Sequence, residues 1–491
     1  MKWRILILSA ISLFFTACQV QENIQDGQTA YKLKKYKLAA ELLQKDFNKA
    51  ELPDEKSKIA FQIGESYANN NNYENAGEWY FKAYDLGYES EAILQYALML
   101  KAQEKYEEAL KEFEKYLLEE PYRRPEMTLE MDACKNGIAW KQRQENEYER
   151  DTYVTEITTL NSGDADFNPV IYQGDKLIFT SSRDMSTGEN NDSWTGDKYY
   201  DLYVANIKDV TSFSAPELFK GPFNAAYNDG TLAFNKDYSE VYFTRCGSDD
   251  RKVDDYCGIY VSNYLPDGGW SEPVALPFFD DTMNIGTPCL SLDGNTLFFA
   301  ATNPDGYGGA DIYMSRRTES GWDAAYNAGQ VINTSGNEVF PYFDSEGVMY
   351  FSSDKHPGLG GLDIFSATWK NNKFSNIKNL EYPINSGADD FGMILLDKKQ
   401  FADSDTLNAG YFSSNRKGGM GDDDMYFFAK TTKKLRPPVF VLKGTVLEKV
   451  YLDSLDVNST VLDTIPLDKS IATLSYPNEQ TLLGKWNIGD E

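Results

Sequence analysis

Five copies of one short segment, spread over residues 151–432, constrain the fold of this 491-residue chain more than any other feature. The copies are KYYDLYVA, YCGIYVSN, GGADIYMS, GGLDIFSA and GDDDMYFF, and they align on Tyr203, Tyr260, Tyr313, Phe365 and Tyr426. Successive anchors are 57, 53, 52 and 61 residues apart, which suits one four-stranded blade per copy. Units repeated at such a period bury their apolar faces only against neighbouring units. The sequence therefore predicts a WD-repeat-like β-propeller of five blades over residues 151–432.

The copies share one internal order of strands and loops. Each begins with an apolar strand such as KLIFTSSR, continues through a loop rich in glycine and aspartate, and enters the D-[IL]-[YF] strand. Four copies carry an aspartate where the loop enters that strand: Asp201, Asp311, Asp363 and Asp424. A carboxylate there can accept backbone N–H groups and fix the turn. We interpret these aspartates as structural rather than catalytic, because Gly258 replaces the aspartate in the second copy.

A strand that precedes the first copy indicates how the ring closes. Turns that begin with Asn-Ser or Asn-Thr end two of the blades, at residues 333–336 and 385–387. A similar turn at residues 161–163 follows the segment YVTEITTL, which has no blade before it. We predict that this segment, residues 153–160, is the fourth strand of the fifth blade, because pairing the first and last strands removes open sheet edges.

The N-terminus, residues 1–17, has the pattern of a bacterial lipoprotein signal. A basic start precedes an apolar run over residues 5–15, which is too short for a permanent membrane span. The run ends in FTAC, with Phe15 where Leu, Val or Ile is more usual. The pattern predicts lipid on Cys18 and attachment to the outer membrane, with the body of the protein facing the periplasm. The alternative is cleavage by ordinary signal peptidase, with Cys18 unmodified.

Residues 18–150 carry three copies of a helical pattern, Y-x-x-A-x-x-x-[aromatic or Leu]. Their alanines, Ala39, Ala76 and Ala109, are 37 and 33 residues apart. Small residues at this period let paired helices pack closely, as in tetratricopeptide repeats, whereas an ordinary amphipathic bundle is the alternative. Stacked helix pairs present a concave surface, and we expect protein partners of the cell envelope to bind it. The side chains expected on that surface are Gln62, Glu65, Gln95 and Tyr96.

Composition bears on the class of function. The net charge of −28 disfavours a nucleic-acid partner, because the phosphate backbone attracts basic surfaces. The single histidine, His356, excludes His-rich zinc sites, and the chain has no P-loop, GxSxG or Cys-x-x-Cys motif. The acidic run at residues 421–424 has the oxygen ligands that Ca²⁺ prefers, but we favour a solvated loop. We therefore predict no cofactor, no metal, no catalytic residue and no enzymatic activity.

Two cysteines of the second blade are placed to form a disulfide. Cys246 ends the second strand of this blade and Cys257 begins the third, so a hairpin brings them together. An exported protein lies in an oxidising compartment, and we predict that the two thiols are bridged. Cys134 falls in a helix and Cys289 in a strand, which predicts that both are buried as small apolar residues.

These features resemble those of a known family, the multidomain outer-membrane lipoproteins typified by the PorE component of type IX secretion. The resemblance rests on FTAC, the Tyr/Ala helical repeats, the five blades and the segment KGTVLEKV after Pro437-Pro438. It implies that residues 438–491 begin a carboxypeptidase-regulatory-like β-sandwich, which this sequence does not complete. Family members usually continue into an OmpA-like domain that holds peptidoglycan. No such segment occurs in this sequence, so we assign no peptidoglycan-binding residue.

The expected fold class is therefore multidomain, with an N-terminal tetratricopeptide-like α-solenoid, a five-bladed β-propeller and an incomplete C-terminal β-sandwich. The expected function is a non-enzymatic, lipid-anchored envelope scaffold that binds proteins. The alternative is a propeller lipoprotein that binds or cleaves glycans, and cleavage would require unlike acids that converge on the funnel. Aromatic side chains at the funnel mouth that differ between blades would favour sugar, whereas a repeated, smooth rim would favour protein.

Overall fold

A computed structural model describes residues 24–184, 186–187, 198–225, 227–247, 256–278, 283–401, 405–432, 447–456, 458–466, 470–475 and 482–488. The chain divides into two compact units, Met1–Lys434 and Leu435–Glu491. The first unit contains a helical region and five sheets of four or five strands each, which confirms the expected fold class. The predicted signal and the lipidation site at Cys18 lie outside the described residues.

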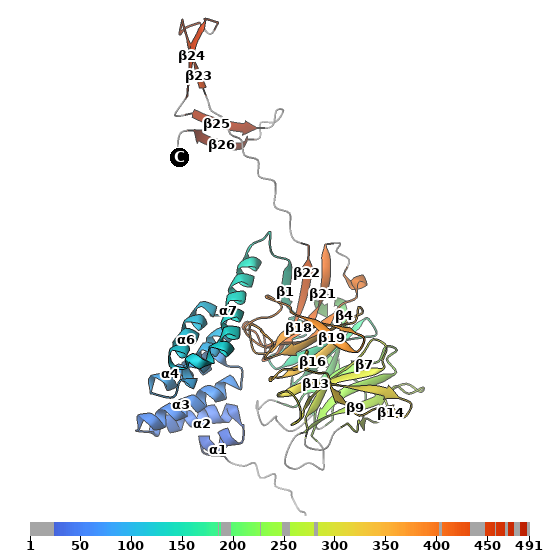
Figure 1. Cartoon of the computed structure of the whole chain (residues 1–491). Coiled ribbons are helices and arrows are strands. Elements are labelled where there is room, and N and C mark those ends of the chain that lie inside the picture. The colour runs from blue at the N-terminus through green and yellow to red at the C-terminus, as the bar shows by residue number, and fades with distance from the viewer. Residues whose placement is uncertain are drawn as a thin grey trace, which may run out of the picture. The chain divides into compact units, whose positions relative to one another are not determined.

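Seven α-helices occupy the N-terminal part of the described chain. They are α1 (Gly27–Lys32), α2 (Tyr36–Lys49), α3 (Pro53–Ala68), α4 (Tyr73–Asp85), α5 (Glu91–Ala102), α6 (Tyr106–Glu119) and α7 (Arg124–Glu145), with the 3-10 turn η1 (Pro121–Arg123) before the last. Each helix packs against the next one in the chain (Figure 1). Side-chain contacts recur at a spacing of 34 residues: Gln28 Nε2 donates to Gln62 Oε1 at 2.6 Å, and Tyr31 donates its hydroxyl to Glu65. Both contacts join α1 to α3.

Two glycines explain how closely the helices approach one another. A Cβ atom added at Gly64 of α3 would lie 2.8 Å from the ring of Tyr80 in α4. A Cβ atom at Gly137 of α7 would lie 2.7 Å from the ring of Tyr106 in α6. Both tyrosines are buried, so the absence of a side chain at each glycine lets a large ring fill the space between two helices.

The five sheets are the blades of a propeller. Blade 1 has β2 (Asp166–Tyr172), β3 (Lys176–Ser181), β4 (Asp201–Asp209), β5 (Ser212–Phe213) and β6 (Glu217–Leu218), and blade 2 has β7 (Asn228–Phe234), β8 (Glu240–Cys246), β9 (Cys257–Asn263) and β10 (Val274–Ala275). Blade 3 has β11 (Ile285–Leu290), β12 (Thr296–Thr302), β13 (Ala310–Thr318), β14 (Gly321–Trp322) and β15 (Tyr326–Asn327), and blade 4 has β16 (Glu338–Phe343), β17 (Val348–Ser353), β18 (Asp363–Lys370) and β19 (Lys373–Asn379). Blade 5 has β20 (Asp390–Leu395), β21 (Thr406–Ser414), β22 (Asp424–Thr431) and β1 (Thr152–Glu156), with the 3-10 turn η2 (Lys398–Gln400) between β20 and β21. Neighbouring strands within each blade run antiparallel.

The predicted closure of the ring is confirmed. Strand β1 pairs with β22 from Thr152↔Lys430 to Glu156↔Tyr426, so the first strand of the propeller completes the last blade. Ile157 and Leu160, which follow β1, are buried in a cluster that joins blades 1 and 5. The Asn161 side chain then donates to the Met425 carbonyl at 3.1 Å and accepts the Met425 N–H at 2.9 Å.

The same bidentate use of an asparagine recurs in other blades. Asn224 bonds the backbone of Leu202, Asn333 that of Ile312 and Asn385 that of Ile364. In each case the amide satisfies both backbone groups of the residue after the repeated aspartate. The asparagine therefore ties a strand of the blade to the loop that leaves it, and it is followed by Ser or Thr at Asn161, Asn333 and Asn385 but by Ala225 at Asn224.

The helical region contacts the propeller at blades 4 and 5. Arg143 of α7 pairs with Glu381 at 2.6 Å, and the Gly387 N–H donates to Glu104 at 3.3 Å. Leu359, from a loop of blade 4, is fully buried in the apolar cluster formed by α5, α6 and α7. The helices and the propeller accordingly share part of one core.

The second unit contains two antiparallel strand pairs. Strand β23 (Leu447–Tyr451) pairs with β24 (Val461–Pro466), and β25 (Ser470–Ser475) pairs with β26 (Leu482–Ile488). The β-sandwich implied by the resemblance remains a prediction. Among the described residues, no helix is both long and apolar enough to span a membrane.

Candidate functional site

The innermost strand of each blade, β2, β7, β11, β16 or β20, lines a central channel. The cavity has a volume of about 260 Å³, close to the lower end of the usual range for small-molecule pockets. Each blade contributes four consecutive residues to its wall: 168–171, 231–234, 287–290, 340–343 and 392–395. Among these described lining residues, none is Lys, Arg, Asp or Glu.

Every inner strand has an irregularity at the first residue of its lining segment. The pairing register shifts there in all five blades, and the residue takes a left-handed backbone: Asn168 (φ 54°), Thr231 (φ 39°), Thr287 (φ 50°), Phe340 (φ 53°) and Gly392 (φ 61°). This conformation is unfavourable for β-branched and aromatic residues and persists only where the surroundings hold it. We call these five positions the bulge ring.

Hydroxyl groups of the preceding blade hold the bulge ring in place. The Asn168 N–H donates to Ser413 Oγ at 2.9 Å, and the Thr231 N–H donates to Thr180 Oγ1 at 3.0 Å. The Thr287 N–H donates to Thr244 Oγ1 at 3.0 Å. Ala300 stands at the corresponding position of blade 3, and the Phe340 N–H instead donates to Thr287 Oγ1 at 3.3 Å. Each such bond joins two blades and satisfies a donor that the bulge removes from its own sheet.

Blades 4, 5 and 1 place aromatic rings at the end of the channel where the bulge ring lies. Phe340 and Phe391 have ring centroids 4.7 Å apart, and Phe391 and Phe167 have centroids 5.9 Å apart. Tyr200 packs edge-on against Phe167 at 5.2 Å. Phe167, Tyr200 and Phe340 are each partly exposed. We call these four residues the aromatic arc.

Blades 2 and 3 present small and polar groups at the same level. The bulge-ring residues Thr231 and Thr287 follow Gly230 and Gly286. A Cβ atom at Gly230 would lie 3.0 Å from Thr180, so the close approach of two blades favours glycine. The Thr231 and Thr244 hydroxyls bond each other at 2.6 Å. The mouth of the channel therefore has two unlike sides, an aromatic arc and a hydroxyl arc formed by Thr231 and Thr287.

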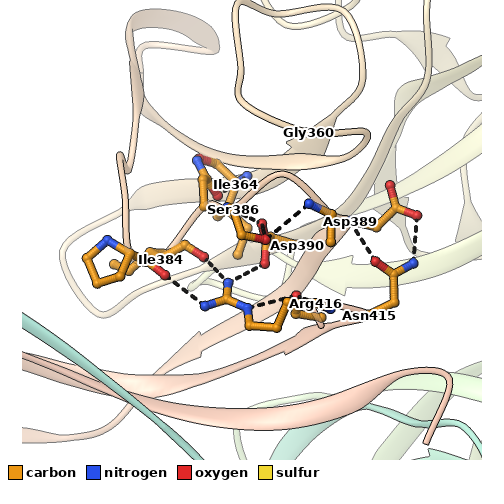
Figure 2. Close-up of polar contacts among 12 residues, drawn as sticks. Gly360, Ile364, Ile384, Ser386, Asp389, Asp390, Asn415 and Arg416 are labelled. Atoms are coloured by element: carbon orange, nitrogen blue, oxygen red, sulfur yellow. Dashed lines mark hydrogen bonds and ion pairs between the residues drawn. The ribbon is translucent and has the colours of Figure 1, made fainter. Parts of the chain in front are cut away.

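Carboxylates at the start of the inner strands lie in buried ion pairs. Asp390 pairs with Arg416 at 2.5 Å (Figure 2), Asp229 pairs with Arg245 at 2.5 Å, and Asp166 pairs with Arg183. The three aspartate side chains are fully buried. Their guanidinium partners also bond loop carbonyls, and the Arg416 Nη2 donates to the Ile384 carbonyl at 2.6 Å (Figure 2). These acids are paired within their blades and are not among the described residues that line the channel cavity.

Each arginine of these pairs lies between two aromatic rings. The Arg416 guanidinium carbon lies 5.0 Å from the ring centroids of both Phe412 and Tyr426. Arg183 and Arg245 have the same arrangement in blades 1 and 2. The planar guanidinium suits this position, since it can stack and form in-plane hydrogen bonds at the same time.

Blade 4 replaces the arginine with His356. Its Nε2 lies 2.7 Å from the Ile332 carbonyl, and its ring packs against Phe351 and Phe365. The carboxylate of this blade, Glu338, accepts hydrogen bonds from Ser353 and Thr334 hydroxyls at 2.6 Å. Burial raises the pKa of Glu338 above its ordinary value. In blade 4, His356 therefore takes the structural role that arginine has in blades 1, 2 and 5.

The four repeated aspartates accept backbone N–H groups from the loops before them. Their donors are Thr187 for Asp201, Tyr307 for Asp311, Leu359 and Gly360 for Asp363, and Gly421 for Asp424. Burial raises the pKa of Asp201 and Asp424 to about 6 and that of Asp363 to about 7. Within the described part of the chain, no three His, Cys, Asp or Glu residues are arranged to hold a metal ion. The acidic run at residues 421–424 thus forms a turn around Asp424.

The structure joins Cys246 and Cys257, which lie opposite each other on β8 and β9. Their sulfur atoms are 2.00 Å apart. Cys134 and Cys289 are free and buried, as predicted.

The four residues expected on a concave helical surface fall into two pairs. Gln62 and Glu65 of α3 bond residues of α1, as described above. Gln95 of α5 donates to Glu91 at 2.7 Å, and the Tyr96 ring lies 5.1 Å from that of Phe81. The first pair is thus partly covered by α1.

The sequence-based analysis did not identify the bulge ring or the two arcs. One signal was present, because proline directly follows the bulge residue in three blades, at Pro169, Pro288 and Pro341. Proline lacks an N–H and marks positions in a strand where the ladder is interrupted. A repeated proline two or three residues into the inner strand could have located the ring.

No family model matches this chain. No curated protein matches it either. Solved structures similar to it include a glycoside hydrolase (10% identity, TM-score 0.38, covering 62% of this chain and 98% of that one). They also include an endo-arabinase from Bacteroides thetaiotaomicron (14%, 0.35, 60% and 99%) and an α-L-arabinofuranosidase from Podospora anserina in complex with cellotriose (11%, 0.34, 56% and 92%). At these identities the similarity concerns the fold alone.

One expectation from the sequence is corrected by these comparisons. We expected a protein without enzymatic activity, but glycoside hydrolases are among the solved structures similar to the chain. The propeller fold therefore gives no ground for excluding catalysis. The expectation rested on aspartates that recur at the same position in successive blades. Their recurrence indicates a structural role for these aspartates and does not bear on the role of other residues.

Proposed function

We propose that the mouth of the propeller channel binds a carbohydrate and that the protein handles glycans at the cell envelope. The proposal rests on one observation: the five residues of the bulge ring differ in chemical type from blade to blade. A surface that serves only to close the ring would repeat in several blades, as the buried carboxylate–arginine pairs do in blades 1, 2 and 5. Instead, the bulge ring carries an amide, two hydroxyls, one phenyl ring and one glycine.

The chemistry of the two arcs suits a sugar ring. One face of a pyranose or furanose presents C–H groups that pack on aromatic rings, and the partly exposed Phe340 and Tyr200 offer such surfaces. The hydroxyls of a sugar need hydrogen-bond partners when they leave water. Thr287 Oγ1 accepts the Phe340 N–H, which leaves its own O–H available as a donor. Asn168 adds an amide with both donors and an acceptor.

The proposal concerns binding at this mouth. Hydrolysis of a glycosidic bond needs two carboxyl groups on either side of it, roughly 5–10 Å apart. The described residues that line the channel contain no Asp or Glu, and Asp166, Asp229 and Asp390 at the starts of inner strands are held in buried ion pairs. Residues that line the channel can therefore orient a saccharide, and this is the role we assign to them.

A binding measurement with one conservative substitution tests the proposal. Phe340→Asn removes the ring but keeps a residue type that tolerates a left-handed backbone, as Asn168 does in blade 1. A glycan array would identify ligands, and calorimetry would measure their affinity for both proteins. We expect about a tenfold loss, equivalent to ~1.4 kcal/mol, from the lost stacking. The control Tyr264→Asn changes a half-exposed ring near the outer edge of blade 2 and should leave affinity unchanged.

A second candidate function is protein binding by the helical region, as expected for an envelope scaffold of the type IX secretion kind. A hollow of about 830 Å³ lies beside α1, the α2–α3 turn and α3. Its wall includes the exposed Leu52 together with Asp46, Glu55 and Lys58. Glu55→Lys should weaken recovery of envelope proteins by the intact chain from detergent extracts, whereas equal recovery by both chains would count against this function. Lipid on Cys18 and a periplasm-facing position at the outer membrane belong to this proposal.

A further inference from the structure

The charges around the channel mouth restrict the class of saccharide that it can take. Acidic sugars carry a carboxylate that needs a cation or several free N–H donors to replace its water. The described residues that line the channel supply no cation, as shown above. The question is therefore whether the arginines near the mouth can turn toward a ligand.

Each of these arginines is held by several partners. Arg416 bonds Asp390, the Pro383 carbonyl at 2.9 Å, the Ile384 carbonyl and Ser414 Oγ at 3.0 Å. Arg183 likewise bonds Asp166, the Leu160 carbonyl, and Ser181 Oγ, and Arg245 bonds Asp229 and the Pro222 carbonyl. The three side chains are only 12–16% exposed. Turning one toward a ligand would leave a fully buried carboxylate unpaired, which costs several kcal/mol.

Blade 4 has one further carboxyl group at the start of its inner strand. Glu338 is fully buried and accepts hydrogen bonds from the neutral groups of Ser353 and Thr334. The net charge of the whole chain is −28. An anionic ligand would approach against this field, whereas a neutral one would not be affected by it.

We infer that the channel mouth selects uncharged saccharides and discriminates against glycans that carry uronic or sialic acids. This inference rests on the proposed function, because it specifies the ligand of the same site. The aromatic arc supplies stacking surface, and Asn168, Thr231 and Thr287 supply neutral hydrogen-bonding groups. Recognition then depends on shape and hydroxyl positions rather than on charge.

The test uses the full-length protein and matched pairs of ligands on one glycan array. Each pair has the same backbone with and without charge, such as oligogalacturonides and their methyl esters, or sialylated and desialylated oligosaccharides. We expect at least tenfold tighter binding to the neutral member of any pair that binds, with little change between about 50 and 500 mM salt. Equal or tighter binding of the charged member would overturn this inference and leave the proposed function intact. No binding to any glycan would overturn both.

A gain-of-function variant tests the physical cause. Asn168→Arg adds an unpaired guanidinium to the bulge ring and should raise the affinity for the acidic member of a pair about tenfold. Tyr200→Arg introduces the same charge at a position without a left-handed backbone, in case the first variant does not fold. Circular dichroism shows whether each variant keeps the fold. If both fold and neither gains affinity for an acidic glycan, the absence of a free cation is not the cause of selectivity, and the inference fails.

Discussion

Replacing Arg416 by methionine should destabilise the propeller strongly, although the residue lies at the end of a strand near a surface loop. Methionine retains an unbranched apolar stem that can remain between Phe412 and Tyr426. The substitution removes the guanidinium that pairs with Asp390, and it also removes the donors to the Pro383 and Ile384 carbonyls. The fold would then contain an uncompensated buried carboxylate.

The magnitude follows from the burial of the pair. The Asp390 side chain is fully buried and that of Arg416 is 16% exposed, so water cannot replace the lost partner. Removing one member of a buried ion pair costs about 3–5 kcal/mol. For a chain of this size, each kcal/mol lowers the melting temperature by roughly 2–3 °C, which predicts a decrease of about 6–15 °C. The loss should be smaller at about pH 5, because burial already raises the pKa of Asp390 and protonation removes the buried charge.

Calorimetric melting of the full-length protein measures this effect. The control is Lys135→Met, which breaks an exposed pair with Asp132 of similar length, 2.8 Å, and should cost under about 1 kcal/mol. The double variant Asp390→Asn/Arg416→Met should recover much of the loss, because the unpaired charge is gone. Equal melting temperatures for Arg416→Met and Lys135→Met would refute the argument that buried carboxylate–arginine pairs hold the blades together.

Three further predictions concern the stability of the propeller. Burial raises the pKa of Asp363 to about 7, above roughly 3.9 in the unfolded chain, so the folded state binds the proton more tightly; stability should fall as pH rises from about 4 to 7, and Asp363→Asn should flatten that dependence in melts across this range. Deleting residues 152–161 removes β1 and the buried Ile157, so the variant should aggregate or melt well below the intact chain, whereas unchanged melting would place the closure elsewhere. Reducing the Cys246–Cys257 disulfide, whose cysteines are 11 residues apart, should destabilise the propeller by about 2–3 kcal/mol, and alkylation of both thiols in the unreduced, unfolded protein would show that no bridge exists.

Most features of the propeller that the sequence predicts follow from the spacing of the five repeats. The five anchors placed one blade each, and the orphan segment before the first copy correctly predicted the pairing of β1 with β22. These features depend on local patterns of apolar residues and turns, which a sequence displays directly. The same holds for Cys134 and Cys289, whose neighbours in the sequence indicated burial.

The mouth of the channel could not be predicted in the same way. Its four aromatic residues come from three blades, and Phe167 and Phe391 are more than two hundred residues apart in the sequence. Their contact depends on ring closure and on the bulges, which are set by hydroxyls of neighbouring blades. The repeated aspartates were the most visible pattern in the sequence, but a residue that recurs between blades indicates a structural role that the blades share. The positions of the bulge ring that differ between blades are the ones on which the proposed function depends.

Hydroxyl-radical footprinting with a bound glycan tests the central claim most directly. The full-length protein would be oxidised with and without the tightest ligand from the array, and modified side chains would be located by mass spectrometry. The account predicts protection of Phe340 and Tyr200, with unchanged oxidation of Tyr264 in blade 2 and Tyr122 in η1, which are 50% and 75% exposed. Protection confined to the helical region or to the outer strands, with Phe340 and Tyr200 unaffected, would contradict a glycan site at the channel mouth.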